Sequence, residues 1–151
     1  MCFKFFSRSH LEKCTIENTS WLAFDSEIEA KVVDVYDGDT VTIAFKLGKI
    51  PYLMRCRLFG IDAPELKPPK DRINREKEIA DAITAKNRLS ELCLNKVCYV
   101  VCNGWDKYGG RILGTIYTEK GGVNLNEKMV KEGMAQLYDG KKKVPWLERD
   151  S

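Results

Sequence analysis

Apolar residues in the first half of the chain recur with a period of two, in short runs rich in Val, Ile and Tyr. This alternation is typical of β-strands that bury one face. It predicts strands at residues 28–36, 41–46 and 52–60, with an Asp-Gly turn at 37–38 between the first two. The first half of the chain is therefore expected to be β-structure.

The third predicted strand carries two arginines on one face. Alternation places Met54, Cys56 and Leu58 on the opposite face, and it puts Arg55 and Arg57 on the same side. Two charged side chains on one strand face need either solvent or an anionic partner.

The second half of the chain begins with a helical period at residues 76–93. The apolar stripe of this helix consists of Ile79, Ala82, Ala85, Leu89 and Leu92. Two further strand patterns follow at 96–102 and 111–117. Asn124, with Glu127 three residues later, forms a capping-box pattern that opens a second, short helix.

Five short strands, with a helix between the third and the fourth, are the element order of an OB-type Greek-key barrel. The predicted fold class is α+β, mainly β, with two or three helices. Residues 66–75 contain prolines and several basic residues, and they are predicted to form an exposed loop. Pro145 argues against a long helix at the C-terminus.

Length and composition fit one folded domain, because the chain has 151 residues and 44% hydrophobic content. We expect a partly disordered N-terminal arm at 1–27, the domain at 28–140 and a short basic tail at 141–151. The expected oligomeric state is a monomer.

The formal net charge is +3, which suits a protein that binds a polyanion. No run of 18 apolar residues predicts a membrane span, and the first residues lack the apolar core of a secretory signal. These observations favour an intracellular, cytoplasmic protein.

The six cysteines are Cys2, Cys14, Cys56, Cys93, Cys98 and Cys102. Three of them fall inside apolar strand patterns, where a free cysteine acts as a small hydrophobic residue. The spacing has no C-x-x-C pair and the single histidine is His10, so a zinc site is not expected. We expect reduced thiols.

Four carboxylates lie at the ends of predicted strands: Asp37, Asp39, Asp62 and Glu65. Burial of a carboxylate is costly unless a partner compensates it, and a hard divalent cation with oxygen ligands is a suitable partner. Arg57 lies five residues before Asp62, and an arginine beside such a site suggests a phosphate ligand.

Three motifs in this order resemble the staphylococcal nuclease family. They are Asp-Gly-Asp-Thr at 37–40, Arg-x-x-x-x-Asp-x-Pro-Glu at 57–65 and Asp-Lys-Tyr-Gly-Gly-Arg at 106–111. The resemblance extends over about residues 29–138. It implies the OB-type fold and a calcium-dependent nuclease that hydrolyses phosphodiester bonds of DNA or RNA with little sequence preference.

The resemblance also implies a metal site. Asp39 and Asp62 match the direct calcium ligands, and Asp37 matches an outer-sphere carboxylate. Ala63 stands where the family usually has threonine, and its backbone carbonyl matches a further ligand. Taken alone, the Asp-Gly-Asp run at 37–39 is also consistent with an ordinary hairpin turn.

Glu65 matches the general base of the family, and Arg57 matches the first phosphate-binding arginine. A positioned carboxylate typically contributes about 10²–10⁴-fold to such a reaction. Sequence alone leaves open whether Glu65 removes a proton from water or only orients it.

Arg111 matches the second arginine, but Gly109 and Gly110 precede it where the usual motif has one glycine. The additional residue is either absorbed by the turn or displaces the guanidinium, and a displacement of about 1 Å can cost about 10²-fold. The residues expected to contact substrate are Lys107, Tyr108 and Tyr138.

Two other functions remain open at this point. The chain could be a weak or inactive nuclease-like module that binds nucleic acid or protein. It could also be an ordinary single-strand-binding OB domain, which is disfavoured because carboxylates in the groove would repel phosphate without a metal.

Overall fold

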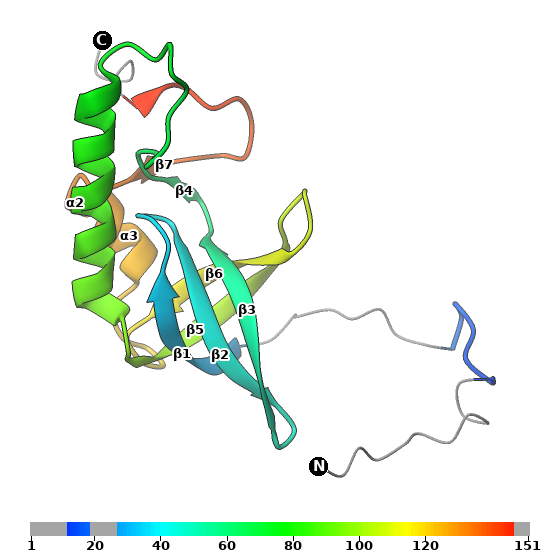
Figure 1. Cartoon of the computed structure of the whole chain (residues 1–151). Helices are drawn as coiled ribbons and strands as arrows, with labels where there is room; N and C mark the ends of the chain where they lie inside the picture. The colour runs from blue at the N-terminus through cyan, green and yellow to red at the C-terminus, as the bar shows by residue number, and fades with distance from the viewer. Residues whose placement is uncertain (1–11, 19–26, 147–151) are drawn as a thin grey trace.

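Five strands form a closed barrel in the computed structural model, which describes residues 12–18 and 27–146 (Figure 1). They are β1 (Glu27–Val35), β2 (Thr40–Leu47), β3 (Ile50–Leu58), β5 (Val97–Trp105) and β6 (Arg111–Tyr117). The barrel order is β1-β2-β3-β6-β5, in which only the β3–β6 pair is parallel. The predicted mainly-β OB-type barrel is confirmed.

The interior of the barrel follows the period-two pattern of the sequence. Val32, Ile43, Cys56, Val100 and Ile116 come from the five strands, and all are fully buried. Alternate positions on the strands point outward, as a pleated strand requires. The core therefore lies inside the closed sheet.

The long helix α2 (Arg75–Cys93) lies along one side of the barrel and extends beyond it (Figure 1). Ala82, Ala85 and Leu89 from the predicted stripe are buried. Glu78 is also buried, although it is charged and lies in the first turn of the helix. The buried face of α2 is therefore apolar in the middle of the helix, as predicted, but not in its first turn.

The short helix α3 (Leu125–Lys131) begins as predicted, because the Asn124 side chain accepts a hydrogen bond from the Glu127 backbone N–H at 3.2 Å. Its buried Asn126 links the helix to the barrel. The Asn126 amide accepts from Ile116 N–H at 3.1 Å and donates to the carbonyls of Phe59 and Gly114 at 3.0 Å each.

Two very short strands, β4 (Ile61–Asp62) and β7 (Gln136–Leu137), pair in an antiparallel way next to the barrel. Tyr138 N–H donates to the carbonyl of Gly60 at 2.9 Å and continues this pairing. The pair fixes the backbone on both sides of Asp62 and Tyr138. The sequence pattern does not predict it, because two residues are too few to show a period.

Residues 139–146 form a segment that we call the C-terminal strap, and they contain no α-helix. The Trp146 indole N–H donates to Asp81 Oδ2 on α2 at 3.1 Å, which fastens the strap to the helix. Most of the expected N-terminal arm, at 1–11 and 19–26, lies outside the described residues. Within the described part of the chain, the strap is thus attached to α2 at Asp81.

None of the helices within the described ranges is long and apolar enough to cross a membrane. The described cysteines Cys14, Cys56, Cys93, Cys98 and Cys102 are free thiols. Burial raises the pKa of Cys56 and of Cys93 to about 12, so both are inert, protonated core residues.

Candidate functional site

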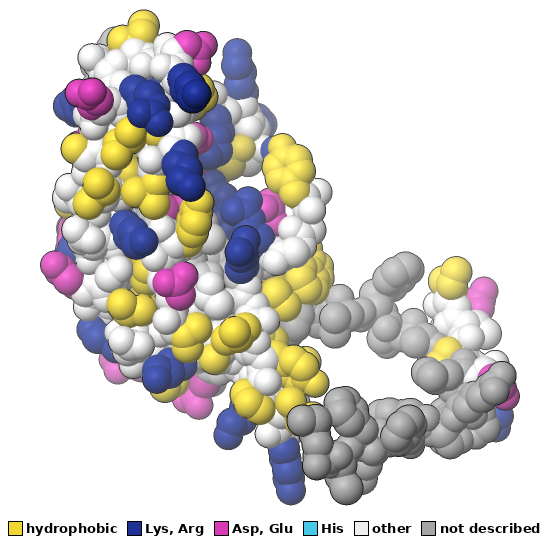
Figure 2. Space-filling model, viewed as in Figure 1, with side chains coloured by type: hydrophobic (Ala, Val, Ile, Leu, Met, Phe, Trp, Pro, Cys, Tyr) yellow, Lys and Arg dark blue, Asp and Glu magenta, His cyan; other side chains and the backbone are white. Residues whose placement is uncertain are grey.

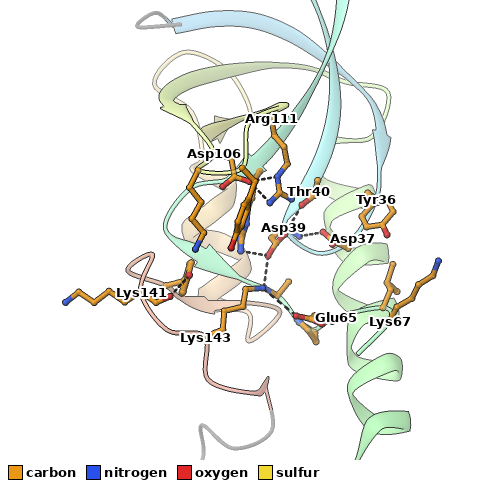
Figure 3. Close-up of a pocket in the computed structure, with 17 residues that line it drawn as sticks. Tyr36, Asp37, Asp39, Thr40, Glu65, Lys67, Asp106, Arg111, Lys141 and Lys143 are labelled. Atoms are coloured by element: carbon orange, nitrogen blue, oxygen red, sulfur yellow. Dashed lines mark hydrogen bonds and ion pairs between the residues drawn. The ribbon is translucent and has the colours of Figure 1, made fainter. Parts of the chain in front are cut away.

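A cleft of about 480 Å³ lies where the β1–β2 turn, the loop after β4, the β5–β6 turn and the C-terminal strap meet (Figure 3). All but one of the predicted site residues line it. They are Asp37, Asp39, Arg57, Ala63, Glu65, Lys107, Tyr108, Arg111 and Tyr138. The exception, Asp62, is 5% exposed and accepts a hydrogen bond from the Arg57 guanidinium.

The first acidic turn is held by hydrogen bonds to its own carboxylates. Asp39 N–H donates to Asp37 Oδ1 at 3.0 Å, and the Thr40 hydroxyl donates to Asp39 Oδ1 at 2.9 Å. Asp39 Oδ2 accepts from the Ala63 backbone N–H at 3.0 Å, which ties this turn to the second acidic segment. Residues 24 positions apart in sequence thereby become neighbours.

The glycine of this turn is required by close packing. A Cβ atom at Gly38 would lie 2.8 Å from the Cβ of Ala63 and 2.8 Å from the Cβ of Ala85. The turn therefore rests directly on α2, with no room for a larger residue.

Arg57 binds both predicted metal ligands. Its Nη2 lies 2.9 Å from Asp62 Oδ1 and 3.4 Å from Asp39 Oδ2, while Nη1 donates to the Ile61 carbonyl at 3.2 Å. The guanidinium also lies 5.7 Å from the centre of the Tyr138 ring. Burial alone would lower the pKa of Arg57, but the adjacent carboxylates outweigh it and raise the pKa. The Arg57 guanidinium therefore stays protonated, and its contacts fix its orientation.

The acidic side chains provide oxygen donors that fit a hard cation such as calcium. Asp39 and Asp62 converge on one nitrogen atom of Arg57, and Asp37 lies beside Asp39. Burial, and then the charge of Asp39, raise the pKa of Asp37 to about 7. Calcium accepts such an irregular set of carboxylate, carbonyl and water oxygens.

This arrangement is not a closed metal cage. Within the ranges that the structure describes, no three Asp, Glu, Cys or His side chains already form a metal-binding group. The Ala63 backbone contributes its N–H to Asp39 here, and its predicted role as a carbonyl ligand stays a prediction.

Lys143 of the C-terminal strap is a cleft residue that sequence reasoning missed. Its Nζ lies 2.8 Å from Asp62 Oδ1 and 3.6 Å from Glu65 Oε1. Figure 3 shows it reaching from the strap toward Glu65. Its one signal in the sequence is the basic run at 141–143, which falls in the predicted basic tail.

The contact with Lys143 changes the titration of its partner. Burial would raise the pKa of Asp62, but the hydrogen bonds and charges of Lys143 and Arg57 outweigh it and lower the pKa. For Lys143, burial would lower the pKa, but Asp62 raises it overall. Both groups are therefore charged at neutral pH.

Arg111 reaches the cleft despite the additional glycine. Gly109 and Gly110 have φ values of 70° and 74°, a left-handed conformation that glycine adopts without strain. Asp106 N–H donates to the Arg111 carbonyl at 2.9 Å and closes the turn. The Asp106 carboxylate holds the Arg111 guanidinium through contacts of 2.7 Å to Nε and 2.5 Å to Nη2. The turn thus absorbs the inserted residue.

Aromatic and apolar side chains form a second cavity, of about 430 Å³, beside the cleft. Its apolar lining includes Phe59, Trp105, Leu113 and Tyr138, and it shares Arg57 with the cleft. Tyr108 is 81% exposed at the tip of the β5–β6 turn, where the Lys107 ammonium lies 5.0 Å from the centre of its ring. Flat apolar surfaces therefore lie next to the cationic groups.

Positive charge predominates around the cleft. Figure 2 shows Lys and Arg side chains gathered in the hollow beside the β5–β6 hairpin. The cationic residues that line the cleft are Arg57, Lys67, Lys107, Arg111, Lys141 and Lys143, whereas the anionic ones are Asp37, Asp39, Glu65 and Asp106. This surface is suited to a polyanion.

Comparison with known proteins agrees with this geometry. Residues 55–149 match the family described as "Staphylococcal nuclease homologue". An "Uncharacterized endonuclease" of Escherichia coli is 32% identical over 120 residues, which cover 80% of this chain and 67% of that protein. A protein with the same description from Haemophilus influenzae is 36% identical over 108 residues, which cover 72% of this chain and 51% of that protein. Because the family match spans well over half of the sequence, the chain belongs to the staphylococcal nuclease family.

Proposed function

We propose that this protein is a calcium-dependent nuclease that hydrolyses phosphodiester bonds. The observation that carries the proposal is the meeting of Arg57, Arg111 and Glu65 with the Asp39 carboxylate in one cleft. Two fixed guanidinium groups and a carboxylate around one space are suited to a phosphate that is attacked by water.

Asp39 and Asp62 would hold the calcium ion, with Asp37 contributing through water. When bound, the ion would supply a positive charge that polarises a phosphoryl oxygen. Because Arg57 and Lys143 pair with the same Asp62 oxygen, these two cations keep the carboxylate ionised and oriented.

Arg57 and Arg111 would bind the phosphate from different elements, the end of β3 and the start of β6. Each guanidinium is already oriented by a carboxylate, Arg57 by Asp62 and Arg111 by Asp106. Such prior orientation lowers the cost of placing the donors when charge develops on the phosphate.

Glu65 is the cleft carboxylate to which we assign the role of proton acceptor. Its side chain is 42% exposed, so water has access to it. A carboxylate in this position would orient the water molecule and take up its proton. We infer that it acts in this way, at the opposite side of Asp39 from Arg111 (Figure 3).

The apolar cavity beside the cleft favours substrates with unstacked bases. Phe59, Trp105 and Tyr138 offer surfaces on which any base can stack, and none of them reads the hydrogen-bonding edge of a base. Binding through phosphate and stacking would give little sequence preference. We therefore propose DNA or RNA with single-stranded character as the substrate.

The test is hydrolysis of plasmid DNA, single-stranded DNA and RNA in calcium, in magnesium and in chelator. The proposal expects hydrolysis in calcium, little in magnesium, which demands near-octahedral geometry, and none in chelator. Glu65→Gln is the control for the chemistry, because it keeps the size of the side chain but is a far weaker base. Nucleic-acid binding without hydrolysis in every condition would favour the inactive binding module instead.

A further inference from the structure

Glu78 is a buried carboxylate that does not line the main cleft. It lies in the first turn of α2 and is only 2% exposed. Burial of a charged side chain costs several kcal/mol unless hydrogen bonds and opposite charges compensate it. An acidic residue near the N-terminus of a helix is favoured by the helix dipole, but exposed Glu76 in the same turn already provides this interaction. The dipole therefore does not explain why Glu78 is buried.

The polar contacts of the Glu78 side chain go to the loop that carries Glu65. Its Oε1 accepts a hydrogen bond from the Glu65 backbone N–H at 3.3 Å. Its Oε2 lies 3.5 Å from the Arg72 guanidinium, in the same loop. Both oxygens are thus used to attach one connecting segment to the helix.

Two other contacts hold this loop farther along the chain, one to the first residue of α2 and one within the loop. The Arg75 guanidinium donates to the Pro68 carbonyl at 3.2 Å, and Arg72 N–H donates to the Pro69 carbonyl at 3.1 Å. These contacts fix the far part of the loop. Among the hydrogen bonds of the described residues, the contact with Glu78 is the one made at the backbone of Glu65 itself.

The two ends of the short Ala63–Glu65 segment are therefore held by two different carboxylates. Asp39 accepts from the Ala63 N–H at 3.0 Å, and Glu78 accepts from the Glu65 N–H at 3.3 Å. Pro64, which lies between them, has a fixed φ angle and adds stiffness. This geometry determines the direction in which the Glu65 side chain leaves the backbone.

We propose that Glu78 is a positioning residue for Glu65. It holds the Glu65 backbone so that the side chain points into the cleft, and it does not touch the substrate. This inference rests on the proposed function for its catalytic consequence, but the contact itself can be tested without any activity. A misplacement of about 1 Å at a reacting group can cost about 10²-fold in rate.

The test uses Glu78→Met, which fills a similar volume but accepts no strong hydrogen bond, and Glu78→Gln, which keeps an acceptor oxygen but loses the charge. The matched control is Glu76→Gln, in the same helical turn and exposed. Amide hydrogen exchange at Glu65 is measured by NMR, in chelator and in calcium. We expect at least about 10-fold faster exchange at Glu65 in Glu78→Met, about 3-fold in Glu78→Gln and no change in Glu76→Gln.

Kinetics in calcium provide the second readout. We expect kcat to fall by about 10–100-fold in Glu78→Met with KM changed less than about twofold, because a positioning contact acts on the chemical step. In a Glu65→Gln background the same substitution should have no further effect. If amide exchange at Glu65 is unchanged in a Glu78 variant that folds, the proposal is wrong. It is also wrong if Glu78→Met lowers kcat by the same factor in the Glu65→Gln background as in the wild type. If the wild-type protein has no nuclease activity, the proposed function fails, whereas the exchange experiment still decides the role of Glu78.

Discussion

The Lys143 ammonium lies 2.8 Å from Asp62 Oδ1, the same oxygen that accepts from Arg57 at 2.9 Å. One carboxylate oxygen of the predicted metal site is thus shared by two side-chain cations. A divalent ion that binds Asp62 has to compete with the ammonium for this oxygen. Lys143 belongs to the strap rather than to the barrel, and its side chain is 46% exposed, so it is the cation that can move away.

We therefore predict that Lys143→Gln binds calcium more tightly than the wild type and melts at a lower temperature in chelator. The first effect follows from removal of the competing cation, and the second from loss of an ion pair with a buried carboxylate. Calorimetric titration and thermal melts measure the two effects. Lys142→Gln is the control, because it removes the same charge from an exposed neighbour. A weaker affinity for calcium in Lys143→Gln would show that Lys143 supports the metal site instead.

The carboxylate of Asp37 gives a prediction for pH. Its pKa is raised to about 7 by burial and by Asp39, compared with about 3.9 in an unfolded chain. Between these values the folded chain binds a proton more strongly than the unfolded chain, so this contribution to stability is present at low pH and is lost as pH rises through about 7. Asp37→Asn should therefore be more stable than the wild type at pH 8 in chelator.

The measurement is urea unfolding of both proteins in chelator at pH 5.5 and pH 8. The difference in stability should be larger at pH 8, and the calcium affinity of Asp37→Asn should be lower at that pH. Asp34→Asn serves as the control, since Asp34 is an exposed carboxylate of β1. The same dependence on pH in Asp37→Asn and in the wild type would contradict this account of the pKa.

The two arginines are expected to have comparable importance. Arg57→Lys and Arg111→Lys should each lower kcat by about 10²–10³-fold, because a lysine is a point charge and cannot make the bidentate contact of a guanidinium. Lys107→Gln should mainly raise KM, since Lys107 lies at the exposed rim. Steady-state kinetics in calcium test these expectations. A nearly neutral Arg111→Lys would mean that the Asp106 ion pair keeps Arg111 from the phosphate.

Close packing of the first acidic turn gives a prediction for stability. Gly38→Ala would place a methyl group 2.8 Å from the side chains of Ala63 and Ala85, and overpacking of this kind costs about 1–3 kcal/mol. Ala85→Gly in the same protein should restore part of the loss by making room, despite the lower helix propensity of glycine. Urea unfolding of the single and double variants tests this. Additive losses would show that the turn does not rest on α2 at this point.

Much of the fold could be predicted from the sequence, because barrel strands and helix α2 are long enough to show their periods. The short pair β4 and β7 could not be predicted, since two-residue strands have no period and depend on contacts between distant segments. Glu78 could not be assigned to the buried face either. A carboxylate is buried only where tertiary contacts such as the Glu65 N–H compensate it.

The candidate site, too, could be predicted only in part from the sequence. Its motif residues could be predicted from their spacing. The position of the Arg111 guanidinium could not, because it depends on the backbone conformation of Gly109 and Gly110. From the sequence, the four carboxylates need a compensating partner, but their spacing does not show which cations lie beside them. In the structure, Arg57 and Lys143 pair with Asp62, whereas burial and then the charge of Asp39 raise the pKa of Asp37. The pairing of cations with carboxylates depends on the path of the C-terminal strap. Local sequence patterns do not determine this path.

We propose that this cleft hydrolyses nucleic acid with the help of calcium. The decisive measurement is the cleavage rate of a fluorescent single-stranded DNA in calcium, followed by addition of excess chelator and then of excess calcium. We predict hydrolysis that stops with chelator and resumes with calcium, and that is absent throughout in Asp39→Asn. A rate that chelator leaves unchanged, or equal rates in the wild type and Asp39→Asn, would exclude calcium-dependent hydrolysis at this cleft.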